Sequence, residues 1–175
     1  GSGVAVEADL RDPGQCRTLV ERAAAAMGPP DAMVFAASAS SLALTGDADA
    51  DVWRTVLETN VMAPALVTRH LLPGLAPGAF LAYLSSEVVG DPYHGLVHYA
   101  SSKAALEELI RGLRVEHPTQ RFCCVRVGAT IDTEFARDFS PQLTAGLYPH
   151  WVARAKMPQT FMVSEDVGGA IADLV

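Results

Sequence analysis

The stretch FLAYLSSEVVGDPYHGLVHYASSKAALEELIRGLRVEHPTQRFCCVRV, residues 80–127, decides the fold that we predict for this chain. It begins with an unalternated apolar run, continues through a long amphipathic segment and ends in a second apolar run. Apolar runs without alternation are typical of strands buried on both faces, and a helix between two such strands indicates that the strands are parallel. This strand–helix–strand unit therefore predicts an α/β fold.

The same alternation of apolar strands and amphipathic helices extends over the rest of the chain. We predict further strands at residues 4–8 and 31–38, and further helices at residues 12–28, 49–75 and 164–175. Asp12 and Ser164 are the expected N-caps of the first and last helices, and Gly28 is the expected end of the first. The pattern predicts one Rossmann-like domain over residues 1–175, with a doubly wound parallel sheet that helices cover on both faces.

Composition excludes several classes of protein. Half of the residues are apolar and 19% are charged, which indicates a packed core. The net charge of −7, without a cluster of Lys and Arg, argues against nucleic-acid binding. The sequence has no apolar run long enough to span a membrane and no start typical of a signal peptide. Because its three cysteines form no disulfide framework, we expect a cytoplasmic protein with reduced thiols.

Tyr99 and Lys103 are the first candidates for chemistry. They lie four residues apart, which places them about 40° apart on one helix face. A cation within about 4–6 Å of a phenol lowers its pKa, so we expect Tyr99 to exchange a proton near neutral pH. Ser86 ends the preceding strand 13 residues earlier, where its hydroxyl is placed to hold a carbonyl oxygen. The alternative is that Ser86 only ends a strand and Lys103 only borders the buried helix stripe.

Asn60 is a second, independent candidate in the preceding helix. It shares a face with apolar residues, where an amide costs free energy unless it is hydrogen-bonded. Pro64, four residues later, has no N–H to donate to the Asn60 carbonyl. We therefore predict a kink and a free carbonyl at Asn60, which is either a tolerated irregularity or a water site beside Tyr99 and Lys103.

Asn60, Ser86, Tyr99 and Lys103 resemble, in order and spacing, the catalytic tetrad of the short-chain dehydrogenase/reductase family. The resemblance implies that Tyr99 is the general acid and base and that Ser86 orients the substrate oxygen. It implies that Lys103 lowers the pKa of Tyr99 and holds the nicotinamide ribose. Asn60 would hold a water that links Lys103 to solvent.

The resemblance also implies an NAD or NADP cofactor, without a choice between the two. ADL at residues 8–10 resembles the family's adenine site, and MVFAAS at 33–38 occupies the place of its Asn-Asn-Ala-Gly strand end. VRVGATIDTEF at 125–135 resembles the Pro-Gly-x-Ile-x-Thr segment beside the nicotinamide. The expected cofactor contacts are Asp9, Leu10, Ala36, Ala37, Tyr99, Lys103, Gly128, Ile131 and Thr133.

The chain departs from the family pattern at several of these contacts. Phe35-Ala36-Ala37-Ser38 lacks both amides and the glycine, Val127 replaces a proline, and one extra residue follows Gly128. No Gly-x-x-x-Gly-x-Gly turn occurs in the sequence, which begins at the family's third strand and stops before its last. Without strands 1, 2 and 7 the sheet is incomplete, and a lone third strand is unstable. We expect a fragment, a protein seen only in part, or a divergent member whose strands pair differently.

Three functional interpretations follow from the resemblance. The first is an enzyme that interconverts a carbonyl and an alcohol of a small molecule with NAD(P). The second is a catalytically inactive binding or assembly protein on the same fold, or an inactive fragment of the enzyme, because the phosphate-binding turn is missing. The third is an isomerase or epimerase of the related extended family, whose larger C-terminal substrate domain has no counterpart here.

Two further segments are expected to shape the substrate cleft. His94 and His98 lack a carboxylate or cysteine that would complete a metal site, so we predict no metal. Tyr93 and His94 are expected to line the cleft. Residues 136–162, which contain three prolines, are expected to form a mobile lid.

The helices at residues 51–72 and 99–116 have more apolar surface than one sheet face needs. Related reductases pair through these two helices about a two-fold axis. We therefore predict a homodimer or homotetramer with an isologous interface, in which Val61 and Leu66 contact the partner.

Overall fold

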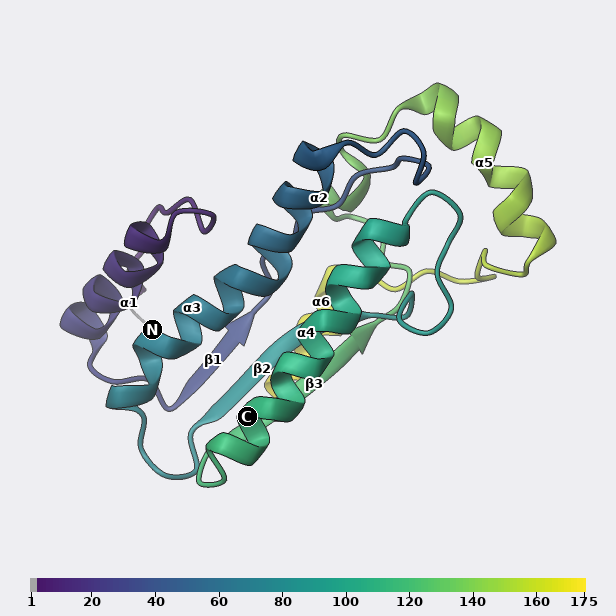
Figure 1. Ribbon diagram of the computed structural model, residues 1–175. Coiled ribbons are helices and arrows are strands. Elements are labelled where there is room, and N and C mark those ends of the chain that lie inside the picture. Colours follow the sequence, from purple (N-terminus) through teal and green to yellow (C-terminus); the bar gives the residue numbers. More distant parts are fainter. Residues whose placement is uncertain (1–2) are drawn as a thin grey trace.

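The computed structural model describes residues 3–175 and has a three-stranded parallel sheet at its centre (Figure 1). The strands are β1 (Ala32–Phe35), β2 (Phe80–Ser86) and β3 (Arg121–Val127), in the order β1-β2-β3. Phe80 of β2 lies opposite Ala32 of β1 and Arg121 of β3, so the carboxyl ends of the three parallel strands lie at the same end of the sheet. This confirms the predicted parallel α/β architecture and three of its predicted strands, although β1 is shorter than expected.

The α-helices of residues 3–175 cover the sheet unevenly. In Figure 1, α1, α3 and α4 lie against one face and α6 lies against the other, while α5 lies apart from the sheet. None of the helices in residues 3–175 is both long and apolar enough to cross a membrane. The helices are α1 (Pro13–Met27), α2 (Ala50–Leu57), α3 (Ala63–Leu71), α4 (Val97–Glu116), α5 (Pro141–Ala153) and α6 (Ser164–Ala172).

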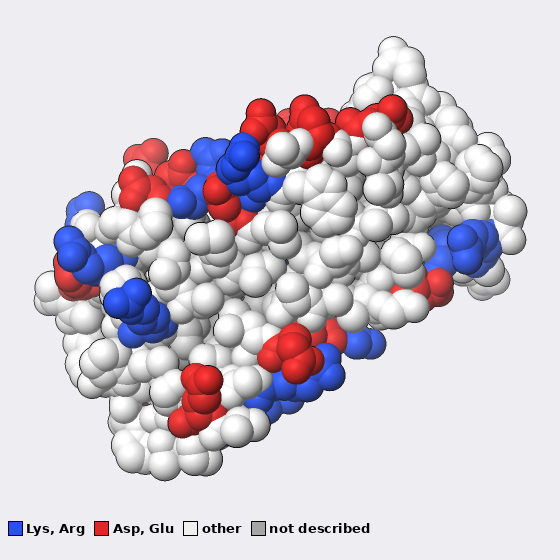
Figure 2. Space-filling view, viewed as in Figure 1, with Lys and Arg blue, Asp and Glu red and all other residues white. Residues whose placement is uncertain are grey.

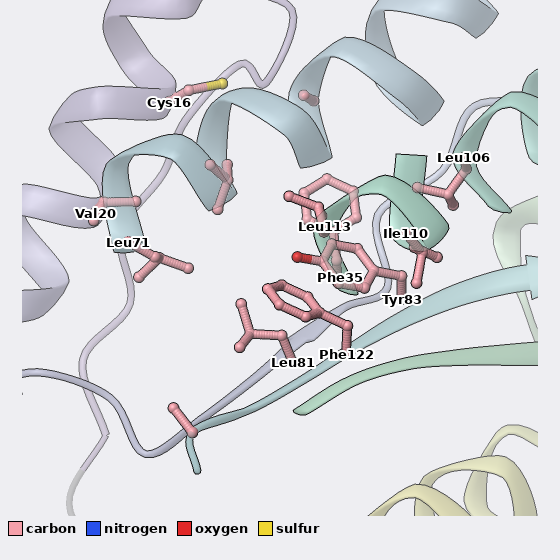
Figure 3. Close-up of a cluster of buried hydrophobic side chains, with 13 residues drawn as sticks. Cys16, Val20, Phe35, Leu71, Leu81, Tyr83, Leu106, Ile110, Leu113 and Phe122 are labelled. Carbon is pink, nitrogen blue, oxygen red and sulfur yellow. The ribbon is translucent and has the colours of Figure 1, made fainter. Parts of the chain in front are cut away.

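The main core lies between the sheet and the face formed by α1, α3 and α4 (Figure 3). Leu81 and Tyr83 of β2 and Ile110 of α4 are completely buried at its centre. Each large apolar side chain that is buried in this way stabilises the fold by about 1.5–3 kcal/mol. The Tyr83 hydroxyl is satisfied by Thr68 at 2.6 Å, so this polar atom adds no unpaired group to the core.

The predicted strand at residues 4–8 is absent, and that prediction was wrong. Residues 3–9 have no regular secondary structure and pair with no strand of the described chain. A strand gains stability only when a neighbour satisfies its N–H and C=O groups. Residues 4–8 lack such a neighbour, because the edge strand β1 forms no ladder with them.

The predicted helix at residues 49–75 is continuous but irregular. Between α2 and α3 lies a π-helical turn, Glu58–Met62, in which the Ala63 N–H donates to the Glu58 carbonyl, and a 3-10 turn, Leu72–Gly74, ends the segment. Pro64 cannot donate to Asn60, so the chain inserts one residue into the turn that precedes the proline. The helix is thus irregular at the predicted place, whereas the kink and the free carbonyl of Asn60 stay predictions.

Both ends of α1 match their predicted caps, whereas the start of α6 does not. Asp12 accepts hydrogen bonds from Gly14 N and Gln15 N, and Gly28 ends the helix with a φ of 82°. At α6, Ser164 is the first helical residue rather than its N-cap. Its N–H donates to Asp132 Oδ1 at 3.0 Å and its hydroxyl to Oδ2 at 2.9 Å, so a distant carboxylate caps this helix.

Candidate active site

A cavity of about 920 Å³ lies over the carboxyl ends of the three strands, the edge at which parallel sheets place ligand sites. Its wall is formed by residues from β2, α4, α5, α6 and the segment after β3. Six of the residues predicted from the sequence line it: Ala36, Ser86, Tyr99, Lys103, Gly128 and Thr133. Residues as far apart in the chain as Ala36 and Thr133 thus meet in one site.

Tyr99 lies in the first turn of α4, and its phenol is close to Ser86, the last residue of β2. The neighbouring hydroxyls of Ser86 and Ser38 favour the ionised form of the phenol. Burial outweighs them and raises the pKa of Tyr99 above its ordinary value. The predicted lowering of this pKa was therefore wrong, and at neutral pH Tyr99 is a proton donor.

The position of the Lys103 ammonium group is consistent with the absence of an effect of its charge on the pKa of Tyr99. The Nζ atom donates to the Leu84 carbonyl oxygen at 2.8 Å and lies 5.6 Å from the centroid of the Tyr99 ring. Only 2% of Lys103 is exposed, and this burial lowers the pKa of its ammonium group to about 8. Lys103 thus faces the site with a charge that titrates just above neutral pH.

Asn60 lies behind the cavity wall and connects two elements. Its Oδ1 atom accepts from Ala39 N at 2.8 Å and from Ser38 Oγ at 3.1 Å. Its Nδ2 atom donates to the Ala39 carbonyl and to Ser102 Oγ, each at 2.9 Å. All four hydrogen-bonding positions of the side chain are used, so the π turn fixes the loop after β1 against α4.

Four predicted cofactor contacts do not line this cavity: Asp9, Leu10, Ala37 and Ile131. Asp9 forms an exposed ion pair with Arg11 at 2.8 Å, and hydrogen bonds from Arg11 lower its pKa to about 2. Leu10 packs against the main core, while Ile131 is exposed. Their roles toward a cofactor stay predictions.

Sequence reasoning missed a group of polar residues opposite Tyr99. The Tyr93 hydroxyl contacts Glu87 Oε1 at 2.9 Å and the Lys156 carbonyl at 2.6 Å, and Lys156 forms an ion pair with Asp91. Burial, followed by Glu87, raises the pKa of Tyr93 to about 12. Tyr93 lines the cavity, as predicted. Glu87 and Lys156 also line it but were not predicted, because no sequence motif contains them.

The prediction that His94 lines the cleft was wrong. Its ring stacks on His150 with centroids 4.8 Å apart, and its carbonyl accepts from the indole N–H of Trp151 at 2.8 Å. His98 is buried in α4, where Nε2 contacts Ser41 at 2.9 Å. Both histidines thus hold segments together around the site.

The predicted lid contains the helix α5, which packs over the Tyr99 side of the cavity. Leu147 and Trp151 of α5 belong to a second buried cluster together with Leu42, Leu96 and Tyr99. The Phe135 ring meets the Tyr99 ring edge-on at 5.1 Å between centroids. Apolar groups thus enclose the phenol on the substrate side, and the mobility of this lid stays a prediction.

Comparison with known proteins gives a consistent result. The family model for short chain dehydrogenase matches residues 2–144. A short chain dehydrogenase of Pseudocercospora fijiensis is 34% identical over 66% of this chain, and the short chain dehydrogenase asqE of Emericella nidulans is 28% identical over 96% of it. The chain spans 39% and 63% of the lengths of these two relatives.

Solved structures resemble the fold over nearly the whole chain. A short-chain dehydrogenase/reductase from Serratia marcescens is 21% identical, with a TM-score of 0.81 over 98% of this chain and 68% of its own. A short chain dehydrogenase from Burkholderia cenocepacia, solved in complex with NADP, is 26% identical, with a TM-score of 0.79 over 96% of this chain and 67% of its own.

Proposed function

Because this chain belongs to the short chain dehydrogenase family, we propose that it is the catalytic part of an NAD(P)-dependent oxidoreductase that interconverts a carbonyl and an alcohol. The observation that carries the proposal is the meeting of Tyr99, Ser86 and Lys103 in one cavity over the strand ends. A buried phenol between two hydroxyls, with an ammonium group behind it, is suited to proton transfer.

In the direction of reduction, the chain's own residues bind and protonate the carbonyl oxygen. The Ser86 hydroxyl donates to that oxygen and fixes its position. Tyr99, whose raised pKa keeps it protonated at neutral pH like an ordinary tyrosine, gives its proton to the oxygen and is left as a phenolate. A nicotinamide cofactor supplies the hydride that completes the alcohol. Solvent then returns a proton to Tyr99.

The residues around the cavity fit the nicotinamide and ribose part of such a cofactor. A Cβ at Gly128 would lie 3.3 Å from Glu87 Oε2 and from Met162 Sδ, so a side chain there would fill the space at the end of β3. Lys103 is the donor for ribose hydroxyls, and Ala36 and Thr133 complete the walls. We keep Asp9, Leu10, Ala37 and Ile131 as proposed cofactor contacts outside this cavity.

Related proteins support a nicotinamide cofactor without deciding between NAD and NADP. The structure from Burkholderia cenocepacia contains NADP, and a blue fluorescent protein from a metagenomic library, 25% identical, was solved in complex with NADPH. The residues that discriminate between the two in this family lie at the end of its second strand. We therefore propose both cofactors as candidates, with a small carbonyl compound as substrate.

We also propose a homodimer or homotetramer that forms through α3 and α4. Figure 2, viewed from the side of α1, α3 and α4, shows charged residues mainly along the margins of this face and an uncharged band between them. Met62, at the end of the π turn, is 51% exposed. Val61 and Leu66 are both half-buried, and Leu66 also packs against the core, so Val61 is the better candidate for a partner contact. The three free cysteines fit a cytoplasmic location.

A non-catalytic binding protein is the second candidate function. The loss of both amides in Phe35-Ala36-Ala37-Ser38, at the end of β1, favours it, because a changed strand end alters the cofactor contacts. Yet the structure holds this loop in place through Ala39 and Asn60. The two candidates differ in whether bound cofactor is consumed.

Consumption of NADH and NADPH by the intact protein tests the proposal. We expect saturable cofactor binding and loss of reduced-cofactor absorbance with at least one member of a panel of aliphatic, aromatic and cyclic carbonyl compounds. Alcohol should form in equal amount to the cofactor consumed. Cofactor binding without turnover over the whole panel would favour the second candidate, and absence of binding would contradict both.

A further inference from the structure

Among the described residues that line the cavity, Glu87 is the one with a carboxylate. It directly follows Ser86, and its N–H donates to the Val127 carbonyl oxygen at 3.0 Å, which fixes its backbone at the end of β2. Its side chain extends toward Gly128, where a Cβ would lie 3.3 Å from Glu87 Oε2. Most of the other lining residues are apolar, among them Val88, Leu96, Trp151, Met157 and Phe161. Glu87 thus places a carboxylate in a mainly apolar site.

Tyr93 supplies less than this carboxylate needs. Its hydroxyl oxygen lies 2.9 Å from Glu87 Oε1 and 2.6 Å from the Lys156 carbonyl oxygen, and both of these atoms are acceptors. The hydroxyl has a single proton, which it keeps at neutral pH because burial, followed by Glu87, raises the pKa of Tyr93 to about 12. One proton thus serves two acceptors, and within residues 3–175 no other hydrogen bond reaches the Glu87 carboxylate.

Lys156, the nearest cation in this part of the wall, does not compensate the charge of Glu87. Its side chain is 8% exposed, and its Nζ atom donates to the Asp91 carbonyl oxygen at 3.1 Å and forms an ion pair with the Asp91 carboxylate. None of the ion pairs in the described part of the chain includes Glu87. Asp91 therefore neutralises the Lys156 ammonium group, and the charge of Glu87 is left for a ligand to balance.

A substrate in the cavity changes the surroundings of this carboxylate. Water can donate to Glu87 while the cavity is open, but a bound molecule displaces that water, and a carboxylate that loses water without gaining a donor costs free energy. Neighbouring Cα atoms are about 3.8 Å apart, so a substrate whose carbonyl oxygen is held by Ser86 lies beside Glu87. The chemistry of the substrate near its carbonyl group therefore decides whether Glu87 favours or opposes binding.

We propose that Glu87 is a specificity-determining residue, which selects carbonyl compounds that carry a hydrogen-bond donor and prefers a protonated amine to a neutral hydroxyl group. The proposal rests on the proposed function, since it takes the ligand of the cavity to be a carbonyl compound. A protonated amine donates to the carboxylate and also balances its charge, whereas a hydroxyl group only donates and an alkyl group does neither. A second carboxylate on the ligand is rejected, because two like charges then meet in an apolar site.

Acetophenones that differ in one ring substituent provide the test with the intact protein. Aminomethyl, hydroxymethyl and ethyl substituents have nearly the same size, and acetylbenzoate supplies an anion; each is used in the meta and the para position. Glu87→Gln keeps the size of the side chain without its charge, and Glu87→Leu also removes its hydrogen-bonding atoms. Glu134→Gln is the matched control, because Glu134 precedes Phe135 of the cavity wall but is exposed and pairs with Arg137.

In the wild type we expect kcat/KM for the aminomethyl compound to exceed that for the ethyl compound by about 10–100-fold in the better ring position, the size expected for a hydrogen bond to a charged group. The hydroxymethyl compound should lie between them, and acetylbenzoate should react most slowly. The preference for the amine should fall to about threefold or less in Glu87→Gln and reverse in Glu87→Leu, which favours the alkyl group. It should keep its wild-type value in Glu134→Gln.

Calorimetric titration of the same ketones in the presence of oxidised cofactor measures binding without reaction, and the dissociation constants should follow the same order. Equal kcat/KM and equal binding of the aminomethyl and ethyl compounds in the wild type would overturn the proposal. So would a preference for the amine that persists in both Glu87 variants or that falls equally in Glu134→Gln. Binding that prefers the amine through Glu87, without reduction of any ketone, would overturn the proposed function and leave the class of ligand established.

Discussion

The two faces of the sheet differ in what covers them. On one face, α1, α3 and α4 bury Leu81 completely, whereas on the other Val34 of β1 is 44% exposed and α6 borders a cavity. The neighbours Val34 and Phe35 show the contrast within one strand, since Phe35 is 7% exposed. The closed face supplies packing, and the open face together with the strand ends supplies the space and the polar groups of the site.

Lys103 is the residue at which stability and function have opposite requirements. Its buried charge destabilises the fold, whereas the proposed site needs that charge. We expect Lys103→Met to lower kcat by about 10²-fold or more, since it removes the donor that we propose for the ribose hydroxyls of the cofactor. The same change should raise the free energy of unfolding at pH 7. Turnover and thermal unfolding of the same samples check both effects.

The pH dependence of that gain has a defined sign. The pKa of Lys103 is about 8 in the folded chain and 10.5 ordinarily, so the folded state disfavours the ammonium form by about 3 kcal/mol below pH 8. Between pH 8 and 10.5 the unfolded chain binds more protons, and this penalty declines. The stabilisation by Lys103→Met should therefore be largest below pH 8 and vanish near pH 10.5. A gain independent of pH would contradict this account.

Truncation of one apolar residue on each face measures the difference in packing. Leu81→Ala, on the closed face, should lower the free energy of unfolding by about 2–5 kcal/mol, because it leaves a cavity in a fully buried cluster. Val34→Ala, on the open face, should cost less than about 1 kcal/mol. Chemical denaturation of the two variants provides the comparison, and equal losses would mean that the open face is packed in solution.

Gly95 gives a smaller effect at the border of the cavity. Its φ is 85°, and a Cβ there would lie 2.5 Å from Leu147 Cδ1 of α5 and 3.0 Å from Leu42 Cδ1. Gly95→Ala should cost about 1–2 kcal/mol and raise KM by displacing α5. Gly90→Ala is the matched control, because Gly90 has a φ of 89° but no atom within 4 Å of its Cβ position. Gly90→Ala should lower the free energy of unfolding through the strained backbone alone and leave KM unchanged. Equal values of KM in the two variants would mean that α5 does not contribute to substrate binding.

Much of the fold could be predicted because its signals are local. The apolar runs of β2 and β3, the cap at Asp12 and the proline after Asn60 each act on neighbouring residues. The helix α5 was missed although its signals are equally local. Ser140 caps it before Pro141, and Leu143, Leu147 and Trp151 recur every four residues.

The errors arose where a distant group decides the outcome. Residues 4–8 have the composition of a strand but no neighbour in the described chain. The capping of α6 depends on Asp132, 32 residues earlier, and the raised pKa of Tyr99 depends on its burial. Ser38 stands where the family pattern has glycine, and that departure was its only signal in the sequence.

Single-turnover reduction with Tyr99→Phe tests the central claim most directly. Tyr148→Phe is the control, because Tyr148 is exposed on α5 and does not line the cavity. We predict that Tyr99→Phe binds NAD(P)H as the wild type does but forms alcohol about 10²–10⁴ times more slowly, while Tyr148→Phe reacts at the wild-type rate. Alcohol formation at the wild-type rate in Tyr99→Phe, with cofactor binding intact, would contradict the account.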